Sequence, residues 1–388
     1  MSFARRISHL RPEGAYAVLA RAQALEAQGR EIIHLEIGQP DFDTYPHVTE
    51  AGMRAISAGK TRYNPPSGVF ELRQALAQDA GARRGLAFTA EQVVVAPGAK
   101  LLLLLPMLAL LEAGDEVIYP DPGFPSYAAA IGITGAKPVP LPLSETHNFE
   151  FDPQALEARL SPRTRMIILN SPGNPTGSVL SSQALACIAE VARRHDLWLL
   201  SDEIYARLTY EGDAPSIVAL PGMAGRTIVV DGFSKTYAMT GWRLGYGLMP
   251  QPLAARIDLL LTHSVGCTAT FTQHAGLEAV LGPQDAVEAM RQEFRRRRAL
   301  IVEGLNAIPG VHCLTPQGAF YAFPNVKAFG RPVDELAVYL LEEAGVALLP
   351  GTAFGQHGEG YLRLSYANSY ENVQKALQRM ADALKKLL

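Results

Sequence analysis

The sequence predicts an α/β protein in which a large three-layer unit, helix on sheet on helix, is joined to a smaller α+β unit. The first observation is composition, because 388 residues with 48% hydrophobic and 19% charged side chains can bury a large core. The second is a series of short apolar segments between residues 93 and 249 that alternate with helical patterns, which is typical of a mostly parallel sheet covered on both faces. The third is a change of pattern after Pro252, where long helical stretches dominate.

The N-terminal part is expected to contain two helices with a short strand between them. The helices are predicted at Ala15–Gln28 and Val48–Ala58, and the strand at Ile32–Ile37. The strand runs into a turn-rich loop, Gly38–Asp43. The next segment, Thr61–Gly68, contains too much proline and glycine for regular structure.

The central part alternates between strand and helix. β-branched and other apolar residues mark each strand, and apolar residues at helical spacing mark each helix. The expected strands are Val93–Ala96, Glu116–Tyr119, Lys137–Leu143, Met166–Leu169, Leu197–Leu200, Thr227–Val230 and Leu244–Met249. The expected helices are Ala99–Leu111, Ser126–Ile131, Pro153–Leu160 and Ser182–His195.

The C-terminal part is predicted to form the smaller unit together with the N-terminal segment. Its expected elements are long helices up to about Ala307, a segment at His312–Phe323, a helix at Val333–Ala344, strands at Val346–Leu349 and Tyr361–Leu364, and a closing helix with Val373, Leu377, Met380 and Leu384 on one face. We therefore expect residues 46–284 to form the large unit, and residues 1–45 with 285–388 to form the small one.

Charge and cysteine content narrow the class of protein. The net charge of -3 gives no attraction to nucleic acid or to an anionic membrane, and the basic run Arg295–Arg298 is predicted to be a solvated helix face. The three cysteines lie far apart, so neither a disulfide framework nor a zinc site is indicated, and a reducing cytoplasm is expected. The N-terminus lacks the apolar core of a signal peptide, and the apolar run Leu101–Leu111 is too short to span a membrane.

The stretch Asp231–Gly247 carries the strongest indication of chemistry. Lys235 follows a β-branched strand and is surrounded by small and apolar residues. A lysine removed from water loses its proton more easily and becomes a nucleophile towards carbonyl groups. Arg243, eight residues later, offers a guanidinium fork suited to phosphate. Together they suggest an aldehyde that carries a phosphate, pyridoxal phosphate. The alternative is an ordinary strand–loop–strand with two surface cations.

Three further strand ends and one strand carry unusual residues. Pro97–Lys100 follows a strand and opens a helix, where backbone N–H groups could bind phosphate, although taken alone it is more typical of a plain turn. Asn174, in a proline- and glycine-rich loop, could direct its amide at a ligand. Asp202 ends a buried strand and needs a partner, which a pyridinium N–H would provide, whereas Glu203 should point to the opposite face as a structural residue. Arg363 lies in an apolar strand, facing either a buried acid or a ligand carboxylate.

These motifs together resemble the fold-type I pyridoxal-phosphate enzymes, and among them the class I/II aminotransferases of the aspartate aminotransferase family. The resemblance rests on Ser234–Arg243, Asn174–Gly177 and Ser201–Tyr205, which occur in the family's order and spacing, and it extends from Gly38 to Arg363. It implies a three-layer α/β/α large domain with a mostly parallel seven-stranded sheet that binds the cofactor, and a smaller α+β domain.

The resemblance also implies roles around the cofactor ring. Lys235 matches the lysine that binds the cofactor covalently and moves the proton, and Asp202 matches the partner of the ring nitrogen. Tyr205 and Asn174 match the residues that hydrogen-bond the ring hydroxyl, and Tyr205 joins Lys235 and Asp202 as a catalytic residue. Phe124 matches the aromatic residue that stacks on the ring.

Other positions match residues that bind the cofactor phosphate. Gly98, Ala99 and Lys100 correspond to the helix start that binds phosphate through its backbone, and Ser234 and Arg243 correspond to further phosphate ligands. Some relatives have a hydroxyl residue three positions before the lysine, where this chain has a glycine, so one phosphate contact is in doubt.

The remaining matches concern the substrate and a second subunit. Arg363 matches the clamp for the substrate carboxylate, helped by the backbone of Gly38 and by Asn174. Tyr63 matches a tyrosine that reaches the phosphate of the neighbouring subunit, which implies a homodimer with shared active sites. No metal ion is implied.

The implied activity is ping-pong transamination between an L-amino acid and a 2-oxo acid. On the same fold the alternatives are a carbon–sulfur lyase or a cyclising lyase, and, in another class, a ligand-sensing regulator that would need an added DNA-binding module. Dicarboxylate-specific relatives place hydroxyl residues near the start of the chain, where this sequence reads Glu13–Tyr16, and Val265–Thr270 contains no arginine. We therefore expect a neutral amino donor to be preferred over aspartate.

Overall fold

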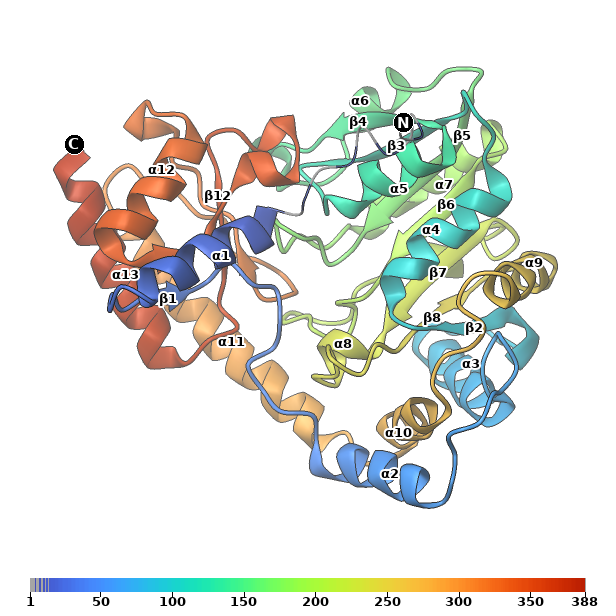
Figure 1. Cartoon of the computed structure of the whole chain (residues 1–388). Coiled ribbons are helices and arrows are strands. Elements are labelled where there is room, and N and C mark those ends of the chain that lie inside the picture. Colours follow the sequence, from blue (N-terminus) through green and yellow to red (C-terminus); the bar gives the residue numbers. More distant parts are fainter. Residues whose placement is uncertain (1–3, 5–6, 8–9, 11, 13, 388) are drawn as a thin grey trace.

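A mixed seven-stranded sheet forms the centre of the molecule (Figure 1). The computed structural model describes residues 4, 7, 10, 12 and 14–387. In spatial order the strands are β2 (Val93–Ala96), β8 (Gly245–Leu248), β7 (Thr227–Gly232), β6 (Trp198–Asp202), β5 (Thr164–Asn170), β3 (Glu116–Asp121) and β4 (Lys137–Pro142). All neighbouring strands from β7 to β4 pair in parallel, whereas β8 pairs antiparallel with both β7 and β2. The predicted fold, a mostly parallel seven-stranded sheet, is therefore confirmed.

Helices cover both faces of this sheet, because alternate residues along each strand point to opposite sides. In β5, for example, Met166 and Ile168 pack in one apolar cluster, and Ile167 and Leu169 pack in another. The first face is covered by α4 (Ala99–Leu110), α5 (Ser126–Thr134) and α9 (Gln251–Thr262). The second is covered by α3 (Phe70–Arg84), α6 (Pro153–Glu157), α7 (Ser182–Arg194) and α10 (Thr270–Leu281), with α2 (Pro46–Ser57) packed on α10.

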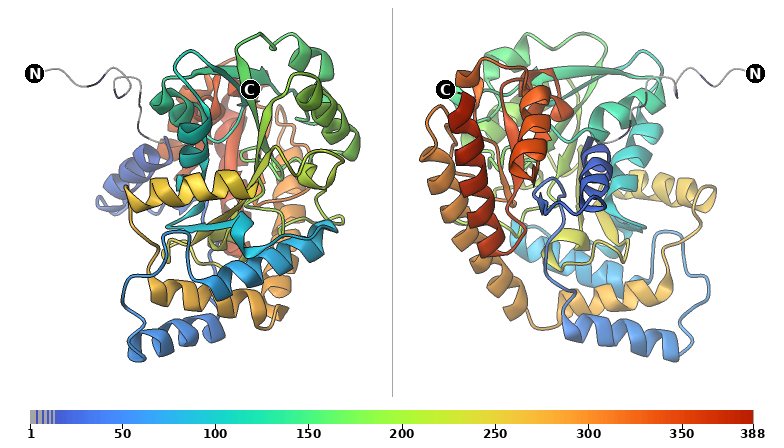
Figure 2. Two further views of the ribbon diagram at one scale, coloured as in Figure 1. Left: turned by 90° about the vertical axis from the view of Figure 1, so that its right-hand side faces the viewer. Right: turned by 60° about the vertical axis from the view of Figure 1, so that its left-hand side comes forward.

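A second unit combines the C-terminal elements with the N-terminal segment. Its helices are α1 (Gly14–Glu26), α11 (Asp285–Asn306), α12 (Val333–Tyr339) and α13 (Tyr370–Leu384), of which α11 and α13 lie side by side (Figure 2). Its strands are β1 (Ile33–His34), β9 (Tyr321–Ala322), β10 (Val346–Ala347), β11 (Leu349–Pro350) and β12 (Leu362–Ser365). Because β1 pairs with β10, the N-terminal segment packs on this unit as expected. The limits 46–284 for the large domain remain a prediction.

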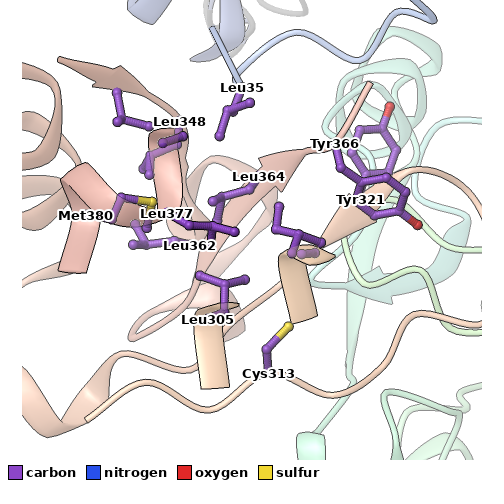
Figure 3. Packing of buried hydrophobic residues seen from close by; sticks show 14 of the residues in the cluster. Leu35, Leu305, Cys313, Tyr321, Leu348, Leu362, Leu364, Tyr366, Leu377 and Met380 are labelled. Atoms are coloured by element: carbon purple, nitrogen blue, oxygen red, sulfur yellow. The ribbon is translucent and has the colours of Figure 1, made fainter. Parts of the chain in front are cut away.

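The core of this second unit is formed by buried leucines and aromatic residues. Figure 3 shows Leu305 of α11, Leu362 and Leu364 of β12 and Leu377 of α13 gathered in one cluster. Tyr321 extends from the edge of the same cluster. Two residues of β12 thus anchor the strand in the core, and this fixes the position of Arg363 between them. Within the described residues, no helix has both the length and the apolar character needed to cross a membrane.

Two helices differ from the expectations. The helix α3 was not predicted, because its buried face is made largely of alanine and glycine, with Leu72 and Leu76 as its only large buried residues, so its apolar pattern is weak. The helix expected at Val333–Ala344 ends at Tyr339 and continues as a π-helical turn over Leu340–Ala344.

The basic run on α11 is only partly a solvated helix face, so that prediction was wrong for two of its four arginines. Arg297 and Arg298 are buried. Arg297 Nη1 lies 2.8 Å from both carboxylate oxygens of Asp41, and Arg298 Nη2 lies 2.6 Å from Glu211 Oε1. A buried arginine is stable only when it is paired, and here the pair with Asp41 fastens the loop that carries Gly38 onto α11.

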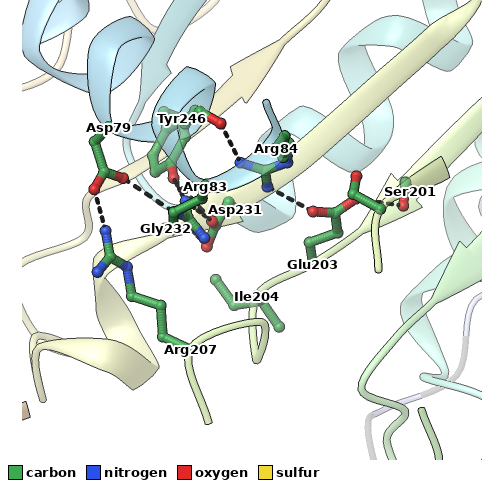
Figure 4. Close-up of polar contacts among 12 residues, drawn as sticks. Asp79, Arg83, Arg84, Ser201, Glu203, Ile204, Arg207, Asp231, Gly232 and Tyr246 are labelled. Atoms are coloured by element: carbon green, nitrogen blue, oxygen red, sulfur yellow. Dashed lines mark hydrogen bonds and ion pairs between the residues drawn. The ribbon is translucent and has the colours of Figure 1, made fainter. Parts of the chain in front are cut away.

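Buried ion pairs join α3 to the ends of β6 and β7 (Figure 4). Arg84 Nη2 donates to Glu203 Oε2 at 2.5 Å, and the other oxygen of Glu203 accepts from Ser201 Oγ at 2.9 Å. Arg83 Nη2 lies 3.2 Å from Asp231 Oδ2, which also accepts from Tyr246 OH at 2.8 Å. Glu203 is therefore a structural residue, as expected, and two strand ends are fixed by charge as well as by packing.

Arg84→Met is expected to destabilise the protein strongly. The Arg84 and Glu203 side chains are only 4% and 6% exposed, so the change leaves a buried carboxylate without its cation. We expect the free energy of unfolding, measured by urea denaturation, to fall by about 3–5 kcal/mol. Arg54→Met is the control, because Arg54 and its partner Glu50 are 65% and 66% exposed. The control should change stability by less than about 0.5 kcal/mol. A loss below about 1 kcal/mol for Arg84→Met would contradict this account.

Candidate active site

A cavity of about 1340 Å³ lies between the carboxyl ends of the central strands and the second unit. It brings together most of the predicted site residues. Those that line it are Gly38, Ala99, Lys100, Phe124, Asn174, Asp202, Tyr205, Ser234, Lys235, Arg243 and Arg363. A larger cavity of about 1530 Å³ between α1, α5 and α12 shares Phe124 with it but contains neither Lys235 nor Asp202. The chemistry therefore places the candidate active site in the smaller cavity.

Lys235 is held at the end of β7 by a short helix, α8 (Phe233–Thr236). Its Nζ donates to the backbone oxygen of Gly38 at 2.5 Å. The side chain reaches the cavity surface but is otherwise enclosed by protein, and this burial is the main reason why its pKa is lowered to about 8.

Neighbouring charges act on the same lysine. The cations Arg363, Arg243 and Lys100 also lower the pKa of Lys235, in that order. The carboxylate of Asp202 raises it, but less strongly. Near pH 7 about a tenth of Lys235 is therefore the neutral amine, far more than for an ordinary lysine, and this is the form that attacks a carbonyl group or accepts a proton.

Asp202 is the last residue of β6 and is almost completely buried. Its Oδ2 accepts a hydrogen bond from Tyr127 OH at 2.7 Å, and its Oδ1 accepts from the backbone N–H of Ile204 at 3.2 Å. Burial raises the pKa of Asp202 to about 6, although both hydrogen bonds lower it. The negative charges of Asp231 and Glu203 contribute to the rise. An acid whose pKa is raised and a lysine whose pKa is lowered thus line one cavity, a pattern common in active sites.

Tyr205 and Asn174 present polar groups to the same cavity. The Tyr205 hydroxyl lies 2.7 Å from the hydroxyl of Tyr321, and burial raises the pKa of Tyr205 well above its usual value. The backbone N–H of Asn174 donates to Asn170 Oδ1 at 2.8 Å, which orients the residue. The side-chain Oδ1 of Asn174 is buried and has no hydrogen-bond partner among the described residues. A buried amide oxygen of this kind is costly unless a ligand completes it.

The start of α4 and the guanidinium of Arg243 form a cradle suited to an anion. Gly98 caps the helix with a φ of 94°, and a Cβ at this position would lie 2.3 Å from Arg243 Nη2. Only glycine therefore allows the guanidinium to approach the N-terminus of the helix. Arg243 Nη1 donates to Thr240 O at 2.9 Å. Nη2 of the same guanidinium lies on the side of Gly98, at the start of α4. Free N–H groups at a helix N-terminus beside a guanidinium are a favourable site for phosphate.

Arg363 lies on β12, opposite Leu349 of β11, and is only 3% exposed. Its guanidinium carbon lies 4.7 Å from the ring centre of Tyr321 and 5.2 Å from that of Phe354, so two aromatic rings hold it. Its Nη2 donates to the backbone oxygen of Glu36. Gly38 is needed beside it, because a Cβ there would lie 2.2 Å from Tyr321 OH. The arrangement is suited to a ligand carboxylate at the cavity wall.

Two of the predicted site residues do not line the cavity, and two residues that line it were not predicted. Gly98 adjoins the cavity through Arg243, whereas Tyr63 is 97% exposed and lies outside it. Sequence reasoning missed Tyr127 and Tyr321, since neither belongs to a recognisable motif. For Tyr127 the available signal was its place at the start of the predicted helix Ser126–Ile131, just after Phe124. Among the described residues, no group of three or more His, Cys, Asp or Glu side chains could hold a metal ion.

A seven-stranded α/β fold with a buried lysine and a buried aspartate in one cavity fits the class of protein that the sequence resembles. Comparison with known sequences agrees with this class. The chain belongs to the family "Aminotransferase class I and II", whose sequence pattern matches residues 30–380. The resemblance seen in the sequence is therefore confirmed.

Individual relatives extend the comparison. The chain is 42% identical to the aspartate aminotransferase of Pyrococcus horikoshii over 91% of each chain. It is 40% identical to aromatic-amino-acid aminotransferase 2 of Thermococcus litoralis over 99% of each. The solved structure of aspartate aminotransferase from Thermus thermophilus with maleate superposes with a TM-score of 0.95 at 39% identity, over 99% of this chain and 100% of that one.

Proposed function

We propose that this chain is a pyridoxal-phosphate-dependent aminotransferase that exchanges an amino group between an L-amino acid and a 2-oxo acid. The observation that carries the proposal is the pairing, in one cavity, of a lysine with a pKa of about 8 and a buried aspartate with a pKa of about 6. The family to which the chain belongs supports transamination, and the relatives' names do not favour the lyase alternatives.

The residues of the cavity fit pyridoxal phosphate. The anion cradle of Gly98 and Arg243 suits the phosphate, and Ser234, Ala99 and Lys100 lie beside it. The unpartnered oxygen or the amide of Asn174 suits the ring hydroxyl, next to Tyr205. When bound, the cofactor supplies an aldehyde that condenses with amines and a protonated ring that draws electrons from the bond being broken.

Each role in the reaction falls to a particular side chain. Lys235 would accept the proton from the substrate Cα and return it, because its amine is partly neutral near physiological pH. Arg363 would bind the substrate carboxylate and hold the Cα–H bond in position, helped by Asn174 and the backbone of Gly38. Asp202 would keep a proton on the ring nitrogen, and Phe124 would pack on the ring face.

A homodimer with shared sites is the second part of the proposal. Tyr63 does not line its own cavity, and 97% of its surface is exposed. The next residue, Asn64, donates to the oxygens of Thr268 and Thr270 at 2.8 Å, so this loop is held against the segment that precedes α10. An exposed tyrosine on a loop that Asn64 holds in place supports the proposal that Tyr63 reaches the phosphate of a neighbouring subunit. The three cysteines are free, which supports a cytoplasmic location.

The third part of the proposal is a neutral amino donor. The cations that line the described cavity are Lys100, Lys235, Arg243 and Arg363. Each already has a place in the proposal: Lys235 in proton transfer, Lys100 and Arg243 beside the phosphate, and Arg363 on the α-carboxylate. A second buried carboxylate needs a cation or several donors, because desolvation is costly. Apolar side chains need only area, at about 25 cal/mol per Å². The cavity provides such area through Tyr16, Leu19, Ile37, Phe124, Phe271 and Phe354.

Lys235 is expected to be the residue that holds the cofactor. Purified protein should absorb in the visible, and reduction with borohydride should attach the cofactor to the peptide that contains Lys235. Lys235→Ala should still bind the cofactor but lose about 10²–10⁴-fold or more in kcat, because the group that moves the proton is absent. Peptide mapping by mass spectrometry gives the answer, and attachment at Lys100 instead would refute the assignment.

Neutral donors are expected to be used better than aspartate. The test is kcat/KM for alanine, leucine, phenylalanine and aspartate at one concentration of the same 2-oxo acid. An advantage for aspartate above about tenfold, or about 1.4 kcal/mol in transition-state binding, would overturn the preference. In that case the Lys100→Met variant tests whether the ammonium of Lys100, which also lines the cavity, binds the second carboxylate.

A further inference from the structure

We propose that Tyr127 is a positioning residue of this site, whose hydroxyl keeps Asp202 ionised and whose ring supports Phe124. The inference rests on the proposed function, because it concerns the aspartate expected to face the cofactor ring nitrogen. Tyr127 acts through these two neighbours, so its effect should depend on their presence.

The first support is the hydrogen bond between Tyr127 and Asp202. Tyr127 lies in the first turn of α5 and has no exposed surface. Its hydroxyl donates to Asp202 Oδ2 at 2.7 Å, a normal length for an O–H donor to a carboxylate. A tyrosine needed only for packing could be phenylalanine, since burying a hydroxyl costs free energy unless it has a partner. Here the partner is Asp202, a carboxylate that lines the same cavity as Lys235.

The second support is the charge around Asp202. The titratable groups whose charge or hydrogen bond acts on Asp202, or on which Asp202 acts, are Tyr127 of α5, Asp231 of β7, Glu203 and Tyr205 after β6, and Lys235 of α8. Asp231 and Glu203 raise the pKa of Asp202, as burial does, whereas the Tyr127 hydroxyl lowers it. Without this hydroxyl, Asp202 would hold a proton more readily. A carboxylic acid cannot act as the anionic partner that keeps the ring nitrogen protonated.

The third support is the contact between two aromatic rings. The ring of Phe124 meets that of Tyr127 edge to face, with centres 5.7 Å apart and planes at 82°. On another side, the ammonium of Lys100 lies 5.1 Å from the centre of the Phe124 ring. Phe124 lines the cavity, so the ring of Tyr127 fixes the angle of the surface that a planar ligand would meet.

Tyr127→Phe separates the two contributions, because it removes the hydroxyl and keeps the ring. In the holoenzyme we expect kcat to fall about ten- to hundredfold, since a hydrogen bond to a charged group shifts a pKa by about one to two units. KM should change less than about twofold, because Arg363 is untouched. With cofactor labelled with ¹⁵N in the ring, the nitrogen resonance should move towards the unprotonated form.

The control is Tyr210→Phe, which removes a buried hydroxyl that donates to the backbone oxygen of Ala319 rather than to Asp202. This variant should leave the ¹⁵N resonance where it is in the wild-type protein. A second test adds Tyr127→Phe to Asp202→Asn. If Tyr127 acts through Asp202, the added change should lower kcat by less than about twofold, because interacting residues are not additive.

Several outcomes would overturn the inference. One is that Tyr127→Phe leaves both the nitrogen resonance and kcat unchanged. Another is that Tyr127→Phe lowers kcat in the Asp202→Asn variant by as much as it does in the wild-type protein. Should Tyr127→Phe fail to fold, fluorotyrosine at position 127 tests the same bond with a stronger donor, and the resonance should then move towards the protonated form; no movement would refute the proposal. Failure of the proposed function is distinguishable, since the wild-type protein would then bind no labelled cofactor.

Discussion

The structure depends on the burial of one ammonium group among other cations. Lys235 is enclosed by protein and lies near Arg243, Arg363 and Lys100, so its proton is held weakly and its pKa falls to about 8. A lysine on the surface would remain protonated and could neither attack a carbonyl group nor accept a proton at neutral pH. Two of these cations, Arg243 and Arg363, are the residues proposed to bind a phosphate and a carboxylate. In the proposed reaction the same charges would bind the anions, and they already lower the pKa of the amine.

Paired cations likewise decide which carboxylate is left to face the cavity. Three carboxylates, Asp202, Glu203 and Asp231, lie at the ends of adjacent strands, and their mutual repulsion must be offset. Arg84 and Arg83 pair with Glu203 and Asp231 from the far side of the sheet, which leaves Asp202 as the carboxylate that faces the cavity. α3, which carries both arginines, contributes no residue to the cavity but determines which acid is available there.

Much of this arrangement could be predicted from the sequence, and the exceptions have physical reasons. Lys235, Asp202 and Asn174 could be placed together, because each follows a strand whose carboxyl end must lie at one edge of a parallel sheet. The reversed direction of β8 was not predicted, because its connection to β7 is about as long as the shortest parallel crossover, although it contains only a short helix. The contacts of Tyr127 and Tyr321 depend on tertiary packing of aromatic rings, which leaves no periodic mark in the sequence.

The most direct test is the titration of Lys235 itself. Competitive labelling of the cofactor-free protein with acetic anhydride from pH 6 to 11, followed by mass spectrometry, reports the rate at each lysine as its amine loses the proton, with the exposed Lys60 as the reference for reagent reactivity. The account predicts that labelling of Lys235 rises with an apparent pKa of about 8. An apparent pKa at the ordinary lysine value of about 10.4 would contradict it, because the amine would then be neither neutral nor nucleophilic under working conditions.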